Sequence, residues 1–215
     1  MTEAKLYPNV KIGPGAQLGD YVVIGVPPRG REVGELETTI GAGAVIRSHT
    51  VIYAGNCIGD RFQTGHFVMI REENQIGDDV SVGTNSVIEH HVVVEDGVRI
   101  HSQAFIPEFS RLESGCWIGP NVVLTNALHP LCPEAKACLK GPHIGRGAKI
   151  GANSTILPDR TVGVDALVGA GSVVVHDVPN RAVVAGNPAR VIKSIDDLNC
   201  PYDLIANPYA PAVEG

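Results

Sequence analysis

Aliphatic residues recur at every sixth position along most of the chain. The series from Ile40 to Leu124 has fifteen members, and only Thr64 among them is not aliphatic. The same phase holds from Ile12 to Ile24 and from Ile144 to Val174, which makes 24 hexads in all. A helical repeat of 3.6 residues cannot produce this period. The pattern therefore predicts a repetitive β structure with one aliphatic side chain of each hexad pointing inward.

Glycine often follows the aliphatic position, as at Gly59, Gly77, Gly83, Gly119 and Gly151. The fourth residue after the aliphatic one tends to be small or aliphatic. We interpret each hexad as a short strand followed by a tight corner. Because glycine lacks a Cβ atom, we expect these glycines to provide unusual backbone angles at the corners.

Several hexads, among them IGDDVS, VGTNSV, IGPNVV and IGANST, resemble the hexapeptide repeats of left-handed β-helix acyltransferases. In that family three hexads complete one triangular coil. The resemblance covers about residues 12–192 and implies an all-β fold, a left-handed parallel β-helix of about eight coils over residues 1–192. Residues 193–215 would then form a C-terminal cap, with one short helix at about 194–205 and a proline-rich tail.

Two segments interrupt the hexads, at about residues 30–39 and 130–143. Fifteen hexads separate them, which is five whole coils if three hexads complete a coil. Both insertions should therefore leave the β-helix at the same corner. Long excursions from a compact fold are usually functional or disordered, and we expect the second insertion to carry site residues.

Composition agrees with a turn-rich β fold, because aromatic residues make up 5% of the chain and there are 25 glycines and 15 prolines.

The net charge of −6 argues against a general binder of nucleic acid or anionic membranes. No apolar run approaches the length of a membrane span, and the first ten residues lack a basic-then-apolar leader, so we expect a cytoplasmic protein. The five cysteines are odd in number and scattered, which predicts free thiols.

The segment from Ile150 to Lys193, with its DVP and AGNPAR elements, resembles the CoA-binding terminus of these acyltransferases. The resemblance implies acetyl-CoA as co-substrate, bound along coil edges between the subunits of a homotrimer. The contacts it implies are Lys149, Gly151, Ala152, Gly169, Ala170, Arg181, Asn187, Arg190 and Lys193. The distribution of charge supports a CoA site independently, since residues 140–193 hold seven basic residues against three acidic ones in an otherwise acidic chain.

The sequence TNALHP resembles the Thr-x-x-His-Pro element of galactoside and maltose O-acetyltransferases, which implies that His129 is the general base. Imidazole suits this role, because its ordinary pKa of about 6.5 lets it accept a proton near neutral pH. His101 is the second catalytic candidate. The two histidines should lie on different faces of one subunit, so they could meet only across a subunit interface. No cysteine has a neighbourhood that predicts a covalent acyl intermediate.

A further stretch, GHFVMIREENQIGDDVSVGTNSVI, is similar to sugar-nucleotide N-acetyltransferases. This resemblance implies a small acceptor, an amino-sugar nucleotide, acetylated on an amino or hydroxyl group. The chain departs from that pattern at residues 101–103, where those enzymes carry asparagines, and at residue 129, which is commonly aromatic there. The acceptor contacts we expect are Glu89, His90, His91, Gln103, Glu108 and Arg111.

Three alternatives remain open. His129, Cys132, Cys138 and His143 have the ligand types of a structural zinc site, although their spacing matches no common zinc module and the favoured mechanism needs no metal. A carbonic-anhydrase-like metalloenzyme of the γ type shares this fold, but no two of the eight histidines have the His-x4-His spacing that it uses. A non-catalytic β-solenoid scaffold is the third alternative, and the AGNPAR terminus argues against it.

Overall fold

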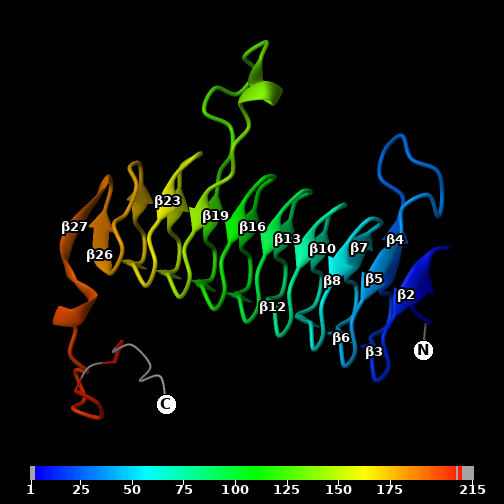
Figure 1. The fold of residues 1–215 in the computed structure, drawn as a ribbon, viewed down its shortest axis with the longest axis horizontal. Coiled ribbons are helices and arrows are strands. Elements are labelled where there is room, and N and C mark those ends of the chain that lie inside the picture. The colour runs from blue at the N-terminus through cyan, green and yellow to red at the C-terminus, as the bar shows by residue number, and fades with distance from the viewer. Residues whose placement is uncertain (1–2, 207, 210–215) are drawn as a thin grey trace.

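The computed structural model describes residues 3–206 and 208–209 and shows a left-handed parallel β-helix built from three sheets. We call them sheets A, B and C, in the order in which the chain visits them. Sheet A has nine strands, sheet B eight and sheet C ten in the described chain. Each coil contributes one strand to each sheet, so the coils stack along one axis (Figure 1). The coil number agrees with the 24 hexads of the sequence.

The strands are short, most of them two residues long. Sheet A contains β1 (Lys5–Leu6), β4 (Val23–Val26), β7 (Val51–Tyr53), β10 (Met69–Ile70), β13 (Val87–Ile88), β16 (Phe105–Ile106), β19 (Val123–Leu124), β22 (Thr155–Ile156) and β25 (Val173–Val174). Sheet B contains β2 (Val10–Ile12), β5 (Thr38–Ile40), β8 (Cys57–Ile58), β11 (Gln75–Ile76), β14 (Val93–Val94), β17 (Arg111–Leu112), β20 (His143–Ile144) and β23 (Thr161–Val162).

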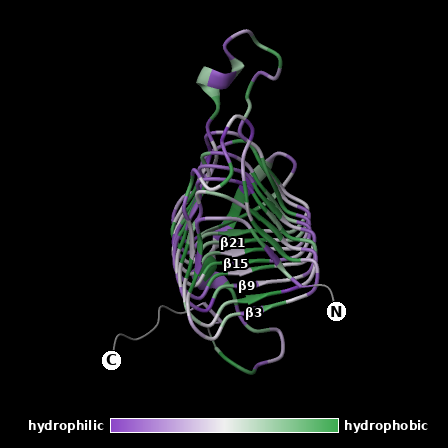
Figure 2. Ribbon diagram, turned by 90° about the vertical axis from the view of Figure 1, so that its right-hand side faces the viewer, coloured by the Kyte–Doolittle hydropathy of each residue, from purple (hydrophilic) through white to green (hydrophobic). Residues whose placement is uncertain are grey.

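Sheet C runs the length of the molecule and ends in a hairpin. It contains β3 (Gln17–Leu18), β6 (Val45–Ile46), β9 (Gln63–Thr64), β12 (Ser81–Val82), β15 (Arg99–Ile100), β18 (Trp117–Ile118), β21 (Lys149–Ile150), β24 (Leu167–Val168), β26 (Ala182–Gly186) and β27 (Ala189–Ser194). Neighbouring strands are parallel except β26 and β27, which are antiparallel. Figure 2, which looks along the axis, shows β3, β9, β15 and β21 one behind another.

The aliphatic position of each hexad forms the core. Ile52, Ile70, Ile88 and Ile106 are fully buried on successive strands of sheet A, and the other two sheets repeat the arrangement. Shortening such a side chain to alanine costs about 2 to 5 kcal/mol of stability. Thr64, the one polar member of the long series, is also buried, and its hydroxyl oxygen accepts a hydrogen bond from the Arg47 backbone N–H at 2.9 Å.

With the exception of Gly25, which has a φ of 86°, the glycines that follow the aliphatic position do not adopt left-handed backbone angles, so that expectation was wrong. Gly59 and Gly151 have ordinary φ values, and the left-handed residues stand two positions later, at Arg61 and Asn153. Glycine is required because the coils stack closely. A Cβ atom on Gly59 would lie 2.3 Å from an Asp78 carboxylate oxygen and 2.7 to 2.8 Å from backbone atoms of the next coil.

Both insertions leave the β-helix at the same corner, as the hexad count predicted. We name the corners by the sheets they join, so corner AB leads from sheet A to sheet B. One insertion lies between β4 and β5 and the other between β19 and β20, which are five coils apart at corner AB. Figure 1 shows both loops projecting from one side of the molecule. The longer loop carries a single 3-10 turn, η1 (Ala135–Cys138).

The C-terminal segment is less helical than expected. In place of a helix over about 194–205, the structure has one 3-10 turn, η2 (Ile195–Asp197), which Ser194 and Asp197 cap reciprocally. Pro201 prevents a regular helix from continuing to residue 205, because proline lacks a donor N–H and disfavours helical angles in the residue before it. Residues 207 and 210–215 of the predicted tail lie outside the described residues. No helix in the described chain is both long and apolar enough to cross a membrane.

Candidate functional site

A cavity of about 340 Å³ opens on sheet C at the C-terminal coils, and we call it the C cavity. Its lining residues come from β18, β21, β24 and the tail. They are Trp117, Lys149, Gly151, Leu167, Val168, Gly169, Ala170 and Tyr209. Four of them, Lys149, Gly151, Gly169 and Ala170, belong to the set expected to bind CoA. The structure therefore gathers the central part of that set around one cavity.

Hexad register explains the members of the C cavity that were not expected. Trp117 and Leu167 each stand directly before the buried aliphatic residue of their hexad, a position whose side chain points outward. These two residues and Lys149 face outward on three neighbouring strands, in register with one another. Tyr209, which lies beyond the repeats, offers no such signal in the sequence.

Lys149 supplies the positive charge of the C cavity. Burial lowers the pKa of its ammonium group, and the Asp165 carboxylate, 4.0 Å away, only partly offsets the effect. Its Nζ donates to the Gly147 carbonyl and lies 5.0 Å from the centre of the Tyr209 ring. A cation inside a largely apolar cavity is suited to an elongated ligand that carries a few polar groups.

Gly151 has a structural role that is independent of any ligand. A Cβ atom there would lie 2.5 Å from the Ala170 nitrogen and 2.7 Å from the Val168 oxygen. At Gly169 the nearest atom would be the Ala185 Cβ at 3.2 Å, which is a tolerable contact after a small shift. Ala152 and Ala170 follow these glycines at corner CA, which leads from sheet C to sheet A.

The remaining residues expected to bind CoA lie toward the C-terminal end of sheet C. Arg181 is engaged by the carboxylates of Asp196 and Asp165, which raise its pKa, so it has limited freedom to bind a phosphate. Arg190 and Lys193 are exposed on β27 and have no carboxylate partner in the described part of the chain. Asn187 lies exposed in the turn between β26 and β27.

His101 is next to the C cavity. It follows β15 at corner CA, is exposed, and its ring packs on that of Trp117 with centroids 4.6 Å apart and planes inclined at 56°. His129 is exposed on the long loop at corner AB. The two catalytic candidates therefore lie at different corners of one chain, as the sequence predicted, and only His101 is close to the C cavity.

Four of the expected acceptor residues gather at corner AB. His90 pairs through Nε2 with Glu108, at 2.5 Å, and its Nδ1 lies 2.8 Å from that of His91. Glu89 belongs to the same cluster through Arg71. The other two lie elsewhere: Gln103 is at corner CA, and Arg111 is on sheet B, paired with Glu95.

The structure does not bring the four zinc candidates together. His143 lies on β20, where its Nε2 is 2.8 Å from a Glu113 carboxylate oxygen. Cys132 and Cys138 are exposed on the loop with His129. Within residues 3–206 and 208–209, no three histidine, cysteine or acidic residues are grouped as a metal site. Cys116 is buried, which raises the pKa of its thiol to about 12 and makes it a poor nucleophile at neutral pH.

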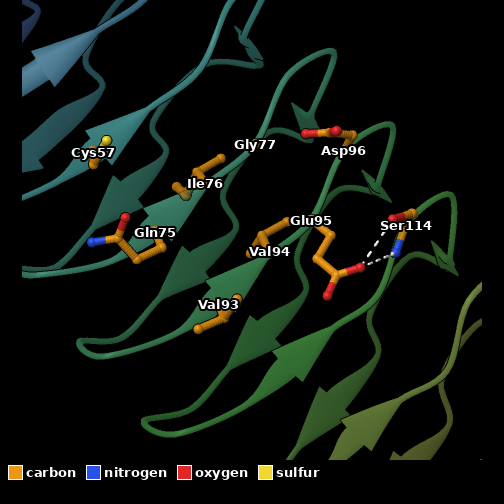
Figure 3. Close-up of a pocket in the computed structure, with 9 residues that line it drawn as sticks. All are labelled: Cys57, Gln75, Ile76, Gly77, Val93, Val94, Glu95, Asp96 and Ser114. Carbon is orange, nitrogen blue, oxygen red and sulfur yellow. Dashed lines mark hydrogen bonds between the residues drawn. The ribbon is translucent and has the colours of Figure 1, made fainter.

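A shallower hollow of about 350 Å³ lies on sheet B. Figure 3 shows its lining, in which Glu95 points toward Ser114 and accepts hydrogen bonds from the Ser114 hydroxyl and backbone N–H. Its acidic members are Glu95 and Asp96. None of the residues predicted from the sequence lines this hollow, and its acidic character does not suit a polyanion such as CoA.

Residues 75–108 match the bacterial transferase hexapeptide repeat in its six-repeat form. Galactoside O-acetyltransferase of Escherichia coli is 32% identical over 136 residues, which cover 57% of this chain and 67% of that enzyme.

A Saccharomyces cerevisiae protein assigned as an acetyltransferase is 31% identical over 127 residues, covering 56% of this chain. The matched part spans 59% of the yeast protein, less than two thirds of its length. The crystal structure of an assigned acetyltransferase from Bacillus cereus superposes with a TM-score of 0.52 at 20% identity and covers 84% of each chain, which is a likeness of fold.

Proposed function

This chain belongs to the hexapeptide-repeat family of bacterial transferases, and from that membership we propose that it is an acetyltransferase that uses acetyl-CoA. The observation that carries the proposal is the C cavity. Lys149, Gly151, Gly169 and Ala170 were all expected to contact CoA, and all four line it. An apolar cavity with one cation at its edge suits the pantetheine arm of CoA, with its amide groups and its thioester end.

The phosphate groups of CoA would lie toward the hairpin of β26 and β27. Arg190 and Lys193 are exposed there and free of carboxylates in the described chain. Lys193 pairs in register with Val183, which pairs with Leu167 of the C cavity. Sheet C therefore connects the hairpin that carries Lys193 with the C cavity. Exposed guanidinium and ammonium groups bind phosphate oxygens through charge-assisted hydrogen bonds.

The acceptor is a small molecule, and we infer a sugar-derived one that presents an amino or hydroxyl group, with an amino-sugar nucleotide as the leading candidate. Similarity to galactoside O-acetyltransferase supports a sugar acceptor. Residues 65–88, which resemble sugar-nucleotide N-acetyltransferases, lie in the coils that precede the C cavity. The His90, His91 and Glu108 cluster offers polar side chains to such an acceptor at corner AB.

A homotrimer would complete the site. The outward residues of sheet A are mostly apolar, and Met69, Phe105 and Val123 are more than a third exposed in the single chain. If three copies pack these faces around one axis, corner CA of each copy meets corner AB of the next, because these two corners border sheet A. His129 of one chain would then approach the C cavity of its neighbour. Leu131, which is 99% exposed on the same loop, would be covered in that assembly.

The proposed mechanism is direct transfer. His129 of the neighbouring chain takes a proton from the acceptor amine or hydroxyl, whose lone pair attacks the thioester carbonyl carbon. A backbone N–H at the coil edge stabilises the oxyanion. The C–S bond then breaks, and the CoA thiolate receives the proton from the imidazolium. His101, packed on Trp117, is the second catalytic candidate because it lies at the same edge of the cavity.

The unpaired cysteines and the use of acetyl-CoA favour a cytoplasmic location.

Calorimetric titration with acetyl-CoA tests the proposal. We expect saturable binding near one ligand per chain, weakened at least tenfold by Ala170→Phe, which fills the mouth of the C cavity at an exposed position. Arg190→Glu should also weaken binding, because it reverses a charge expected to contact phosphate. Ala170→Ser is the matched control and should bind as the wild type does. Absence of binding at millimolar acetyl-CoA would overturn the proposed function.

A further inference from the structure

A second cavity lies on sheet C beside the C cavity, and we call it the arginine groove. It has a volume of about 230 Å³ and runs across β6, β9, β12 and β15. Its lining residues are Arg47, Gln63–Gly65, Ser81–Gly83 and Arg99–Ser102. Arg99 pairs in register with Trp117 of the C cavity, so the two cavities occupy neighbouring strands of one sheet. His101 lines the groove and also packs on Trp117, which places it at their junction.

The charge of the arginine groove differs from that of the rest of the chain. Its lining includes two guanidinium groups and an imidazole, and no aspartate or glutamate among the described residues. Both arginines are exposed, and neither pairs with a carboxylate in the part of the chain that the structure describes. Six other arginines do pair with carboxylates: Arg31, Arg61, Arg71, Arg111, Arg160 and Arg181. Two unpaired guanidinium groups in one cavity of an acidic protein attract anions.

The one irregular hexad explains how Arg47 is held. Thr64 replaces an aliphatic residue in the core, and its hydroxyl accepts the Arg47 backbone N–H, while the Thr64 carbonyl accepts from the Arg47 guanidinium. Burying a hydroxyl where fourteen other hexads bury a hydrocarbon gives up apolar packing. Thr64 is therefore both the one polar residue of the long aliphatic series and the residue that holds Arg47 at the groove. We regard it as a positioning residue.

We propose that the arginine groove binds a diphosphate group of the acceptor. The inference rests on the proposed function, because it names the chemistry of the acceptor that meets acetyl-CoA at the C cavity. A guanidinium group has five N–H donors in a planar array that matches phosphate oxygens. The Arg47 side chain is held on the β9 coil, two strand spacings or about 10 Å from β15, which carries Arg99. This separation suits two linked phosphoryl groups better than one carboxylate.

The position of the arginine groove assigns the diphosphate to the acceptor rather than to CoA. In sheet C, β18, β21 and β24 separate β15 from β26 and β27. Arg190 and Lys193, the expected contacts for the CoA phosphates, therefore lie at the opposite end of the C cavity. An acceptor anchored by its diphosphate at Arg99 would present its reactive group near His101 and Trp117, where the thioester end of the donor is expected.

Titration of the full-length protein with inorganic pyrophosphate tests the site. Trp117 is the only tryptophan and lies beside Arg99, so its fluorescence reports on the groove. We expect saturable binding, weakened about tenfold to a hundredfold by Arg47→Gln or Arg99→Gln. Arg31→Gln, on the first insertion and paired with Glu35, is the matched control and should bind normally. Failure to bind pyrophosphate, equal loss in the control, or citrate binding of equal strength would overturn the proposal.

The same variants distinguish the two sources of a diphosphate. If the groove serves the acceptor, Arg47→Gln leaves the affinity for acetyl-CoA within about twofold of the wild type while pyrophosphate affinity falls. An equal fall in both affinities would place the CoA diphosphate in the groove and overturn the assignment to the acceptor. Normal acetyl-CoA binding without any pyrophosphate binding would refute this inference alone and leave the proposed function standing.

Thr64→Val tests the positioning role separately from stability. Valine restores an aliphatic side chain to the core but removes the acceptor of the Arg47 backbone N–H, so urea unfolding is measured in parallel with binding. Pyrophosphate affinity should fall several-fold at a temperature where the variant is fully folded, because the hydroxyl that holds the Arg47 backbone is lost. A variant with unchanged pyrophosphate affinity would show that Thr64 does not position Arg47 for binding.

Discussion

His101 packs against Trp117 with ring centroids 4.6 Å apart, although the two residues lie sixteen positions apart in the chain. They meet because one coil places β15 next to β18 in sheet C. The pair marks the place where the C cavity, the arginine groove and corner CA adjoin. A reaction between a donor in one cavity and an acceptor in the other would take place at this pair.

Substitution of the two candidate bases should separate their roles. We expect His129→Ala to lower kcat by about a hundredfold to ten-thousandfold, the usual contribution of a general base, with acetyl-CoA affinity unchanged. His101→Ala should lower kcat by less than tenfold. His49→Ala, at the same corner as His101 but far along the axis, is the control. Single-turnover rates with a saturating acceptor measure the effect. A larger loss of rate in His101→Ala than in His129→Ala would assign the base to His101.

Close stacking of the coils, rather than contact with a ligand, should explain why glycine is required at many positions of the repeat. Gly151→Ala should destabilise the protein by about 1 to 3 kcal/mol, because its Cβ would lie 2.5 Å from a backbone nitrogen of the next coil. Gly169→Ala, whose nearest neighbour would be 3.2 Å away, should cost less than half of that. Urea unfolding measures both. Equal losses would mean that coil spacing does not explain the glycines.

How far the sequence predicted the structure follows from what the hexad repeat encodes. The period placed the core, the coil number and the common corner of the two insertions, because an inward side chain at every sixth residue leaves little freedom of register. Lys149, Gly169 and Ala170 were singled out instead by the resemblance to a CoA-binding terminus, and the structure places them around one cavity. Arg47 and Arg99 were missed, because they line one groove from strands that are far apart in the sequence, and no local pattern records which exposed arginines lack a carboxylate partner.

Acidification should weaken the pairing of Glu113 with His143. The His143 ring, 2.8 Å away, and the Arg146 backbone N–H lower the pKa of the Glu113 carboxyl below its ordinary value of 4.5. A lowered pKa in the folded state stabilises the protein above pH 4.5. This stabilisation is lost as the pH falls through the pKa that the Glu113 carboxyl has in the folded protein.

Glu113→Gln should therefore be less stable than the wild type by about 1 kcal/mol at pH 6, and the difference should shrink toward zero near pH 3. Urea denaturation at a series of pH values measures it. Glu134→Gln, exposed on the long loop, is the matched control and should show no such convergence. A difference that stays constant across the series would mean that the carboxylate charge does not carry the interaction.

The shared site should appear in mixed oligomers. Phe105→Glu places a charge on the apolar face of sheet A and should convert a trimer into smaller species by light scattering, whereas Gln75→Glu on sheet B should not. Trimers that combine His129→Ala chains with Ala170→Phe chains should regain activity at an acetyl-CoA concentration where each variant alone has little. In random mixtures about a quarter of the interfaces pair an intact His129 with an intact C cavity. Recovery near that level requires that the two residues act across an interface, and absence of recovery in confirmed mixed trimers would place the whole site within one chain.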